Sequence, residues 1–228
     1  MDAFLSSLLT ASVSGSIVIL AVLILRLVLR RTPKKYICML WMVAGLRLLL
    51  PIPLQSKFSL QPPTVSFPYA ESLQKYLLPA WLLVAIALVL VSLCSYLHLR
   101  RQVKNARKVR GGWECEGLDT AFVLGFLKPK IYIPAGVSEN TRQQILAHER
   151  THLDKGDHWI KLIGFLALVV HWFNPLVWVS YVLLCKDIEM ACDERVVQFM
   201  DLAERKAYSS ALLDCSTHRV HYAACPVA

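Results

Sequence analysis

The sequence lacks the cysteine patterns that are typical of zinc knuckles and of disulfide-rich domains. Its seven cysteines include no C-x-x-C pair and follow no regular spacing, which argues against both classes. It also contains no internal repeat and no low-complexity tract. The first apolar segment has neither a basic start nor a small-residue cleavage site, so we interpret it as a retained helix and not as a removed signal peptide.

Apolar residues, in contrast, are abundant. Hydrophobic residues make up 56% of the chain and the mean hydropathy is +0.47, whereas roughly 45–50% is usual for a soluble domain. Three segments are long enough to cross about 30 Å of hydrocarbon, namely residues 4–29, 36–54 and 76–97. We therefore predict a multi-pass protein of the cell membrane with three transmembrane helices.

The net charge of +9 follows the predicted spans and does not form a nucleic-acid-binding face. Basic residues gather between the first two spans (Arg30, Arg31, Lys34, Lys35) and after the third, in residues 100–110, while residues 55–75 hold only two lysines. Positive-inside bias then predicts an extracellular N-terminus and a cytoplasmic location for everything after Leu99. The cluster at 100–110 is expected to meet anionic lipid headgroups, with no direct nucleic-acid partner.

The composition changes after the third span. A basic helix is expected to lead to Gly111-Gly112, followed by two short strands, residues 121–127 and 131–134, joined by a turn at 128–130. We predict a small cytoplasmic sheet. An exposed edge of this hairpin is a candidate site for a substrate backbone bound as an added strand.

The most informative motif is His148-Glu149-Arg150-Thr151-His152. Ser138 to Thr141 offer a choice of N-cap residues for a helix over this segment, and Gly156 is expected to end it. On such a helix the two histidines share one face and both reach one zinc ion, while Glu149 is placed to hold the attacking water. The pattern predicts a zinc-peptidase core.

A zinc ion held by two histidines needs a third protein ligand and an open position for water. We propose Glu189 as this ligand, with Asp193, one helical turn later, as the residue that accepts a proton from a ligand histidine. Other residues are weaker candidates for the metal: Glu194, His158 and His171, the last two favoured as helix-cap or interfacial residues. Cys192 is close in sequence, but a small buried apolar role is favoured for it.

The distance between the two motifs requires the chain to reverse. A continuous helix over the 36 residues from Leu153 to Ile188 would separate Glu189 from the histidines by about 54 Å. Asn174-Pro175 interrupts this stretch, because proline disfavours helical backbone at the preceding residue. We predict a helical hairpin over 158–186, re-entrant or packed at the inner membrane surface, in place of a fourth span.

Four segments together resemble the BlaR/MecR-type β-lactam sensor-transducers, a family of gluzincin membrane peptidases: residues 123–134, 148–152, 171–178 and 189–196. The resemblance implies His148, His152 and Glu189 as zinc ligands and Glu149 as catalytic base. It also implies that an extracellular signal activates a cytoplasmic peptidase, which leads to loss of a transcriptional repressor and often to self-cleavage.

Family sensors continue into a further transmembrane helix and an extracellular penicillin-binding domain, whereas this sequence stops at Ala228 and residues 218–228 contain no hydrophobic span. We expect either a fragment or a short member that lacks the sensor.

The predicted fold class is a mainly α membrane protein, with a membrane domain at 1–99 and a cytoplasmic α+β zincin-like peptidase domain at 100–228. Candidate partners are a peptide or protein substrate, membrane lipids and a second copy of the chain.

Two alternative functions stay open at this point. One is a non-proteolytic receptor or scaffold with a structural zinc ion. Glu149 argues against it, because a structural site needs no unligated carboxylate beside the metal. The other is a membrane quality-control metallopeptidase, in the manner of the heat-shock membrane gluzincins. The short arms between the histidines and Glu189 argue against that one.

Overall fold

The computed structural model describes residues 2–50, 71–198 and 200–216, and it is mainly helical with one small sheet. In chain order the elements are α1 (Asp2–Val28), α2 (Lys34–Leu49), α3 (Glu71–Gln102), η1 (Val103–Asn105), β1 (Arg107–Val109), β2 (Gly112–Cys115), β3 (Phe122–Leu124), β4 (Lys130–Pro134), α4 (Glu139–Lys155), α5 (Asp157–Val170), α6 (Pro175–Val197) and α7 (Leu202–Ser216).

Two of the described helices are long and apolar enough to cross a membrane, Phe4–Val28 in α1 and Lys75–Asn105 at α3. They coincide with the first and third predicted spans. α2 has 16 residues, which corresponds to about 24 Å and falls short of roughly 30 Å of hydrocarbon. A second span therefore stays a prediction, and its expected end at 51–54 lies outside the described residues.

The chain forms two compact units. The first contains residues 1–90 and 163–187, and the second contains residues 91–162 and 188–228. The predicted helical hairpin is thus grouped with the N-terminal helices over most of its length. The predicted domain boundary at residue 99 stays a prediction.

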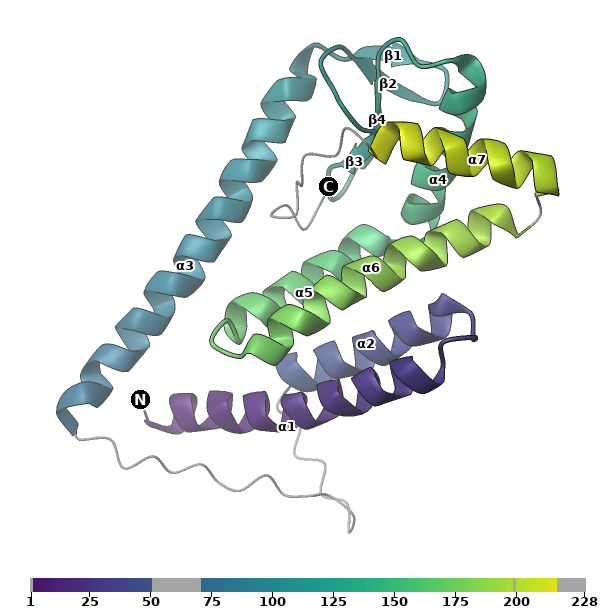
Figure 1. The fold of residues 1–228 in the computed structure, drawn as a ribbon. Helices are drawn as coiled ribbons and strands as arrows, with labels where there is room; N and C mark the ends of the chain where they lie inside the picture. The colour runs from purple at the N-terminus through teal and green to yellow at the C-terminus, as the bar shows by residue number, and fades with distance from the viewer. Residues whose placement is uncertain (1, 51–70, 199, 217–228) are drawn as a thin grey trace. The chain divides into compact units, whose positions relative to one another are not determined.

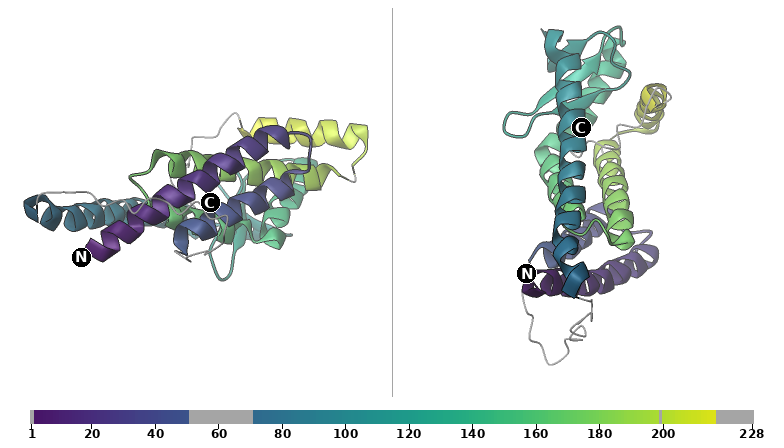
Figure 2. Two further views of the ribbon diagram at one scale, coloured as in Figure 1. Left: turned by 90° about the horizontal axis from the view of Figure 1, so that it is seen from below. Right: turned by 90° about the vertical axis from the view of Figure 1, so that its left-hand side faces the viewer.

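In the first unit, α1 and α2 lie side by side (Figures 1 and 2). Gly15 of α1 faces Leu48 of α2 so closely that a Cβ atom at Gly15 would collide with the Leu48 side chain. A residue without a side chain lets two helices approach in this way, which is the usual means of packing apolar helices in lipid.

The predicted hairpin is present, as α5 and α6. α5 ends at Val170 and α6 begins at Pro175, where the sequence predicted the break. The Asn174 side chain accepts a hydrogen bond from the Leu176 amide at 3.0 Å, and it donates to the hydroxyls of Ser12 and Ser16 at 2.8 and 2.7 Å. The turn between the two arms is therefore bound to α1 through polar contacts.

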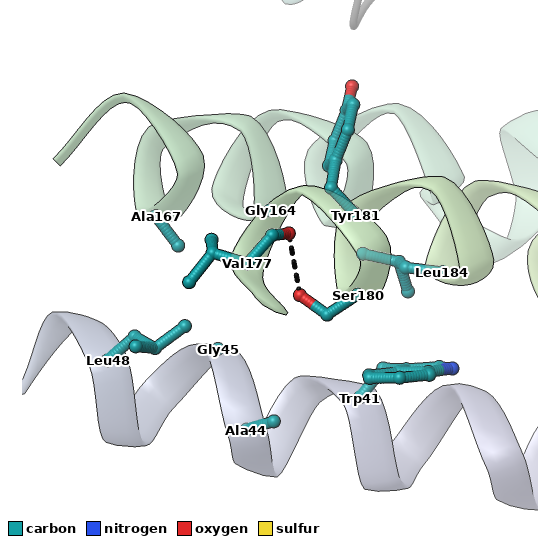
Figure 3. A pocket seen from close by; sticks show the side chains of 10 residues that line it. All are labelled: Trp41, Ala44, Gly45, Leu48, Gly164, Ala167, Val177, Ser180, Tyr181 and Leu184. Carbon is teal, nitrogen blue, oxygen red and sulfur yellow. Dashed lines mark hydrogen bonds between the residues drawn. The ribbon is translucent and has the colours of Figure 1, made fainter. Parts of the chain in front are cut away.

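A small pocket separates α2 from the hairpin (Figure 3). Its lining includes the small residues Ala44, Gly45, Gly164 and Ala167, and Ser180 satisfies its own hydroxyl by donating to the Val177 carbonyl at 2.8 Å. A Cβ atom at Gly164 would lie 2.8 Å from the Leu184 side chain. Small side chains thus set how closely the two arms of the hairpin pack.

The sequence analysis did not anticipate a buried ion pair in this unit. Asp187 has 0% exposure. Its carboxylate accepts three bonds from Arg26, two from Nε at 2.9 and 3.2 Å and one from Nη2 at 3.0 Å, and a fourth from Trp41 Nε1 at 2.8 Å. Four hydrogen bonds on one buried carboxylate, three of them from a charged guanidinium, therefore join α1, α2 and α6.

The second unit contains a four-stranded sheet with the order β1-β2-β4-β3. β1 pairs antiparallel with β2, β3 pairs antiparallel with β4, and the two central strands, β2 and β4, are parallel. The predicted hairpin is confirmed as β3 and β4, with a shorter first strand. The predicted basic helix up to Gly111 is wrong, because α3 ends at Gln102 and a tight turn with Gly111 at φ 92° closes a β1–β2 hairpin.

Alternating side chains give the sheet two apolar faces, as strand geometry requires. Phe122, Leu124 and Tyr132 pack with Leu99 of α3 and Val103 of η1. The neighbouring positions Val123, Ile131 and Ile133 pack with Leu146 and Leu153 of α4. The sheet therefore supports the helix that carries the two histidines.

We predict that Asp187→Ala lowers the free energy of unfolding by about 3 kcal/mol, because it leaves a largely buried arginine without its partner. This is the lower end of the usual range, since the Arg26 side chain keeps 23% exposure. The measurement is chemical unfolding in detergent. The matched control is Lys186→Ala, at the exposed neighbouring position of the same helix, and equal stability of the two variants would contradict the prediction.

Candidate active site

The helix that carries the histidines has the expected ends. The Ser138 hydroxyl accepts a bond from the Thr141 amide at 3.2 Å, and Gly156 terminates α4 with φ 67°. His148 and His152 lie one turn apart near the C-terminal end of this helix, and their rings are 4.7 Å apart between centroids. The predicted helix and the one-turn spacing of its two histidines are confirmed.

Each histidine is oriented through its Nδ1 atom. His152 Nδ1 donates to Asp157 Oδ2 at 2.7 Å. His148 Nδ1 lies 2.7 Å from the Tyr208 hydroxyl, which itself donates to Asp193 Oδ1 at 2.8 Å. Because the hydroxyl hydrogen is used for Asp193, the Tyr208 oxygen accepts from His148. Both rings therefore carry a hydrogen on Nδ1, which leaves Nε2 as the metal-binding atom.

The two Nε2 atoms meet the Glu189 carboxylate. They lie 3.1 Å from each other, and Glu189 Oε2 is 3.2 Å from His152 Nε2 and 3.6 Å from His148 Nε2. The second oxygen, Oε1, accepts a bond from Lys161 Nζ at 3.2 Å. α4 and α6 thus supply three donor atoms that face one point.

This donor set fits a zinc ion. Atoms bound tetrahedrally to zinc at 2.0–2.1 Å lie roughly 3.3–3.4 Å apart, and the three observed separations are 3.1, 3.2 and 3.6 Å. Two Nε2 atoms at 3.1 Å can share one hydrogen but cannot carry one each. The protein alone therefore does not satisfy this site, whereas a cation between the three atoms would.

The surrounding carboxylates favour positive charge at this point. Burial by itself lowers the pKa of His152, but hydrogen bonds with Asp157, Cys192 and Glu189 outweigh it and raise that pKa above its ordinary value. The pKa of His148 is raised in the same way, by Asp193, Cys192 and Glu189. Burial raises the pKa of Glu189, yet its bonds with both histidines hold that pKa well below the usual range.

The pKa of Glu149 shifts in the opposite direction to that of Glu189. Burial raises the pKa of its carboxyl above the ordinary 4.5, although the charges of His148, His152 and Lys161 act in the opposite sense. No hydrogen bond to this side chain is present among the described residues. A carboxylate with a raised pKa beside a metal site is suited to accept and return a proton.

Cys192 offers a competing set of donors. Its sulfur and one nitrogen of each histidine lie within 4.8 Å of one another. The thiol, however, contacts the His148 carbonyl at 3.5 Å and lies 3.8 Å from Nδ1, the nitrogen that Tyr208 already occupies. We therefore favour Glu189, which faces Nε2 of both rings, and assign Cys192 the buried role expected from the sequence.

The structure brings the five predicted site residues together: His148, Glu149, His152, Glu189 and Asp193. His171 lies elsewhere, where its Nε2 donates to the Leu48 carbonyl at 3.1 Å.

Sequence reasoning missed Asp157, Lys161 and Tyr208. Asp157 directly follows the Gly156 turn, which returns the chain to the last turn of α4, so its position was a usable signal. Tyr208 has no local signal.

Comparison with known proteins identifies relatives. The model of the BlaR1 peptidase M56 family matches residues 62–228. The methicillin resistance mecR1 protein of Staphylococcus aureus is 27% identical over 103 residues, which is 43% of this chain and 18% of that protein. The regulatory protein BlaR1 of Bacillus licheniformis is 27% identical over 99 residues, 42% of this chain and 16% of that protein. The aligned region thus covers less than a fifth of either relative.

We predict that the purified protein binds one zinc ion and that Glu189→Ala removes it after dialysis against a chelator, because two histidines alone do not complete the site. Elemental analysis gives the stoichiometry. Two controls lie on the same helix, Cys192→Ala and the exposed Glu194→Ala, and both should retain zinc. Loss of zinc in Cys192→Ala with retention in Glu189→Ala would favour the competing donor set.

Proposed function

Because the chain belongs to the BlaR1 peptidase M56 family, we propose that it is an integral membrane zinc metalloendopeptidase that acts in signal transduction. The observation that carries this proposal is the meeting of His148 Nε2, His152 Nε2 and Glu189 Oε2 within 3.6 Å, with Glu149 adjacent to the first histidine. Three protein ligands and a free carboxylate are the set that catalytic, and not structural, zinc sites use.

A zinc ion held there would polarise a peptide carbonyl and acidify a bound water. The Glu149 carboxylate accepts the proton of the attacking water, and it then delivers that proton to the departing amine. Asp157 and the Tyr208–Asp193 pair hold the two imidazoles with Nε2 free. Lys161 binds Glu189 Oε1 and so directs Oε2 toward the histidines.

The sheet provides a place for the substrate backbone. β3 is an edge strand of the order β1-β2-β4-β3, and Val123 of this strand packs with the residues that α4 contributes to the sheet. We propose that a peptide or protein substrate adds to the edge formed by β3 as a further strand, with main-chain hydrogen bonds giving affinity.

The cellular role is inferred from the relatives and from charge. One relative is named for methicillin resistance and another as a regulatory protein, which supports a role in antibiotic-response regulation. We propose that this role is exerted through loss of a transcriptional repressor. The basic residues that flank α1 and α3 support an extracellular N-terminus and a cytoplasmic peptidase. Anionic lipids are the expected partners of residues 100–110, and the α5–α6 hairpin is expected to be re-entrant or to lie at the inner membrane surface.

The alternatives make different demands on the same residues. A receptor with a structural zinc ion needs the three ligands but has no use for a free carboxylate at Glu149. A quality-control peptidase needs the same chemistry with longer membrane arms, and α5 has only 14 residues. These features favour the signalling peptidase.

We predict that Glu149→Gln retains zinc and lowers the rate of peptide cleavage by about 10²–10⁴-fold, because the amide cannot accept the proton of the water. The assay is cleavage of a quenched fluorogenic peptide library by protein in detergent micelles. Glu139→Gln, a matched change in the exposed first turn of the same helix, should leave the rate unchanged. Undiminished turnover of Glu149→Gln would eliminate the general-base role.

The raised pKa of Glu149 predicts the pH dependence. The base must be ionised, so activity is present above its pKa and is lost as the pH falls through that value. Because burial raises this pKa above 4.5, the acid limb of kcat/KM should lie above pH 4.5. Zinc content measured at each pH separates this limb from loss of the metal. Full activity in zinc-loaded protein at pH 4.5 would be inconsistent with the assignment.

A further inference from the structure

Among the side chains described in helix α7, one is buried against the rest of its unit. Among the side chains described in α7, residues 202–210, Tyr208 is buried at 2% exposure and Ala207 is half-buried, while the others are exposed, Leu202 at 86%. The helix packs against α4 (Figure 1). Of the described side chains of α7, the tyrosine ring is therefore the main contact with the rest of the unit.

The beginning of α7 is stabilised by its own residues. The Glu204 amide donates to Asp201 Oδ1 at 2.7 Å, and the Asp201 amide donates to Glu204 Oε2 at 2.9 Å, which together form a capping box. These bonds make α7 a defined helix, but they do not attach it to the rest of the unit. Docking and helix formation thus rest on different residues.

The hydroxyl of the same tyrosine lies in the metal site. It accepts from His148 Nδ1 at 2.7 Å and donates to Asp193 Oδ1 at 2.8 Å, whereas Asp193 itself is 3.3 Å from His148 Nδ1. The sequence assigned this carboxylate to one of the ligand histidines, and it therefore acts on His148 mainly through the phenol. Removal of the phenol leaves only the longer contact.

We propose that Tyr208 is a positioning residue that couples the docking of α7 to the orientation of His148. The inference rests on the proposed zinc site. When α7 is docked, the phenol holds a hydrogen on Nδ1 and leaves Nε2 for the metal. When α7 moves away, His148 loses its closest partner and the site binds zinc more weakly.

Linkage makes this coupling reciprocal. If a docked α7 strengthens zinc binding by a given factor, bound zinc must strengthen the docking of α7 by the same factor. Zinc should therefore slow amide hydrogen exchange in α7 of the wild-type protein. In Tyr208→Phe the ring still docks but the hydroxyl is gone, so the effect of zinc on α7 should shrink.

The decisive measurement is the zinc dissociation constant, from competition with a chelator, for the full chain in detergent. Tyr208→Phe should weaken binding by about 10-fold or more, the range that partners of metal-binding histidines usually show, and should shift the visible spectrum of the cobalt-substituted protein. The thermal midpoint without metal should stay that of the wild type. Tyr132→Phe, a buried tyrosine of the β4 strand, is the matched control.

A second variant keeps the test independent of how well Tyr208→Phe folds. Asp193→Asn removes the charged acceptor of the phenol at a partly exposed position and should also weaken zinc binding. The double variant should lose less zinc-binding free energy than the sum of the losses in the two single variants, because both residues act through one chain of hydrogen bonds.

The outcomes are distinct. Wild-type affinity and a wild-type cobalt spectrum in Tyr208→Phe and Asp193→Asn would overturn the coupling and leave the proposed peptidase intact. Failure of the wild-type protein itself to bind zinc through His148, His152 and Glu189 would overturn the proposed function. Weaker zinc binding in both variants, with reduced protection of α7, is the result that the proposal expects.

Discussion

The structure depends on one requirement, that a carboxylate on α6 returns to two histidines on α4. The intervening residues are long enough to carry Glu189 about 54 Å away in a continuous helix. Asn174 and Pro175 prevent this, since proline cannot continue the hydrogen-bond ladder and restricts the residue before it. Contacts of Gly164 with Leu184 and of Phe165 with Tyr181 then pack the two arms against each other.

Polar contacts secure this hairpin in surroundings that are otherwise apolar. Asp187 accepts bonds from Arg26 and Trp41, and Asn174 donates to two serines of α1. Such bonds restrict geometry more strongly than apolar contacts, because a buried group left without its partner costs about 1–3 kcal/mol and a charged one more. Apolar packing permits several helix arrangements, while these paired groups favour one.

In the candidate site, too, polar partners surround buried groups, but here the central groups are imidazoles and their partners are carboxylates. Asp157, Asp193 and Glu189 surround two imidazoles whose facing nitrogens are 3.1 Å apart. The carboxylates favour positive charge between the two Nε2 atoms. These atoms are too close to carry one hydrogen each, so a metal cation is the better source of that charge. Glu149 remains outside these bonds and is kept in a partly buried position where its pKa rises. Binding and proton transfer are thereby assigned to different carboxylates.

By itself, the sequence determined the features that depend on neighbours along the chain. Local pattern predicted the start of α4 within residues 138–141, its end at Gly156, the one-turn spacing of the histidines, the β3–β4 hairpin, the break at Pro175 and the family. Capping, periodicity and proline geometry act within a few residues, so they are visible without a fold. The predicted basic helix before Gly111 failed because a short sequence satisfies helix and hairpin patterns alike, and pairing with β4 decided between them.

Only the tertiary structure decided the partners that come from distant segments. Nothing near Tyr208 indicates that its hydroxyl stands between His148 and Asp193, and nothing near Arg26 indicates Asp187, 161 residues later in the chain. Lys161 likewise becomes a partner of Glu189 only when α5 and α6 pack as a hairpin. These are directional polar bonds of about 3 Å, and the pairing of such groups is settled by the folded backbone and not by their order in the chain.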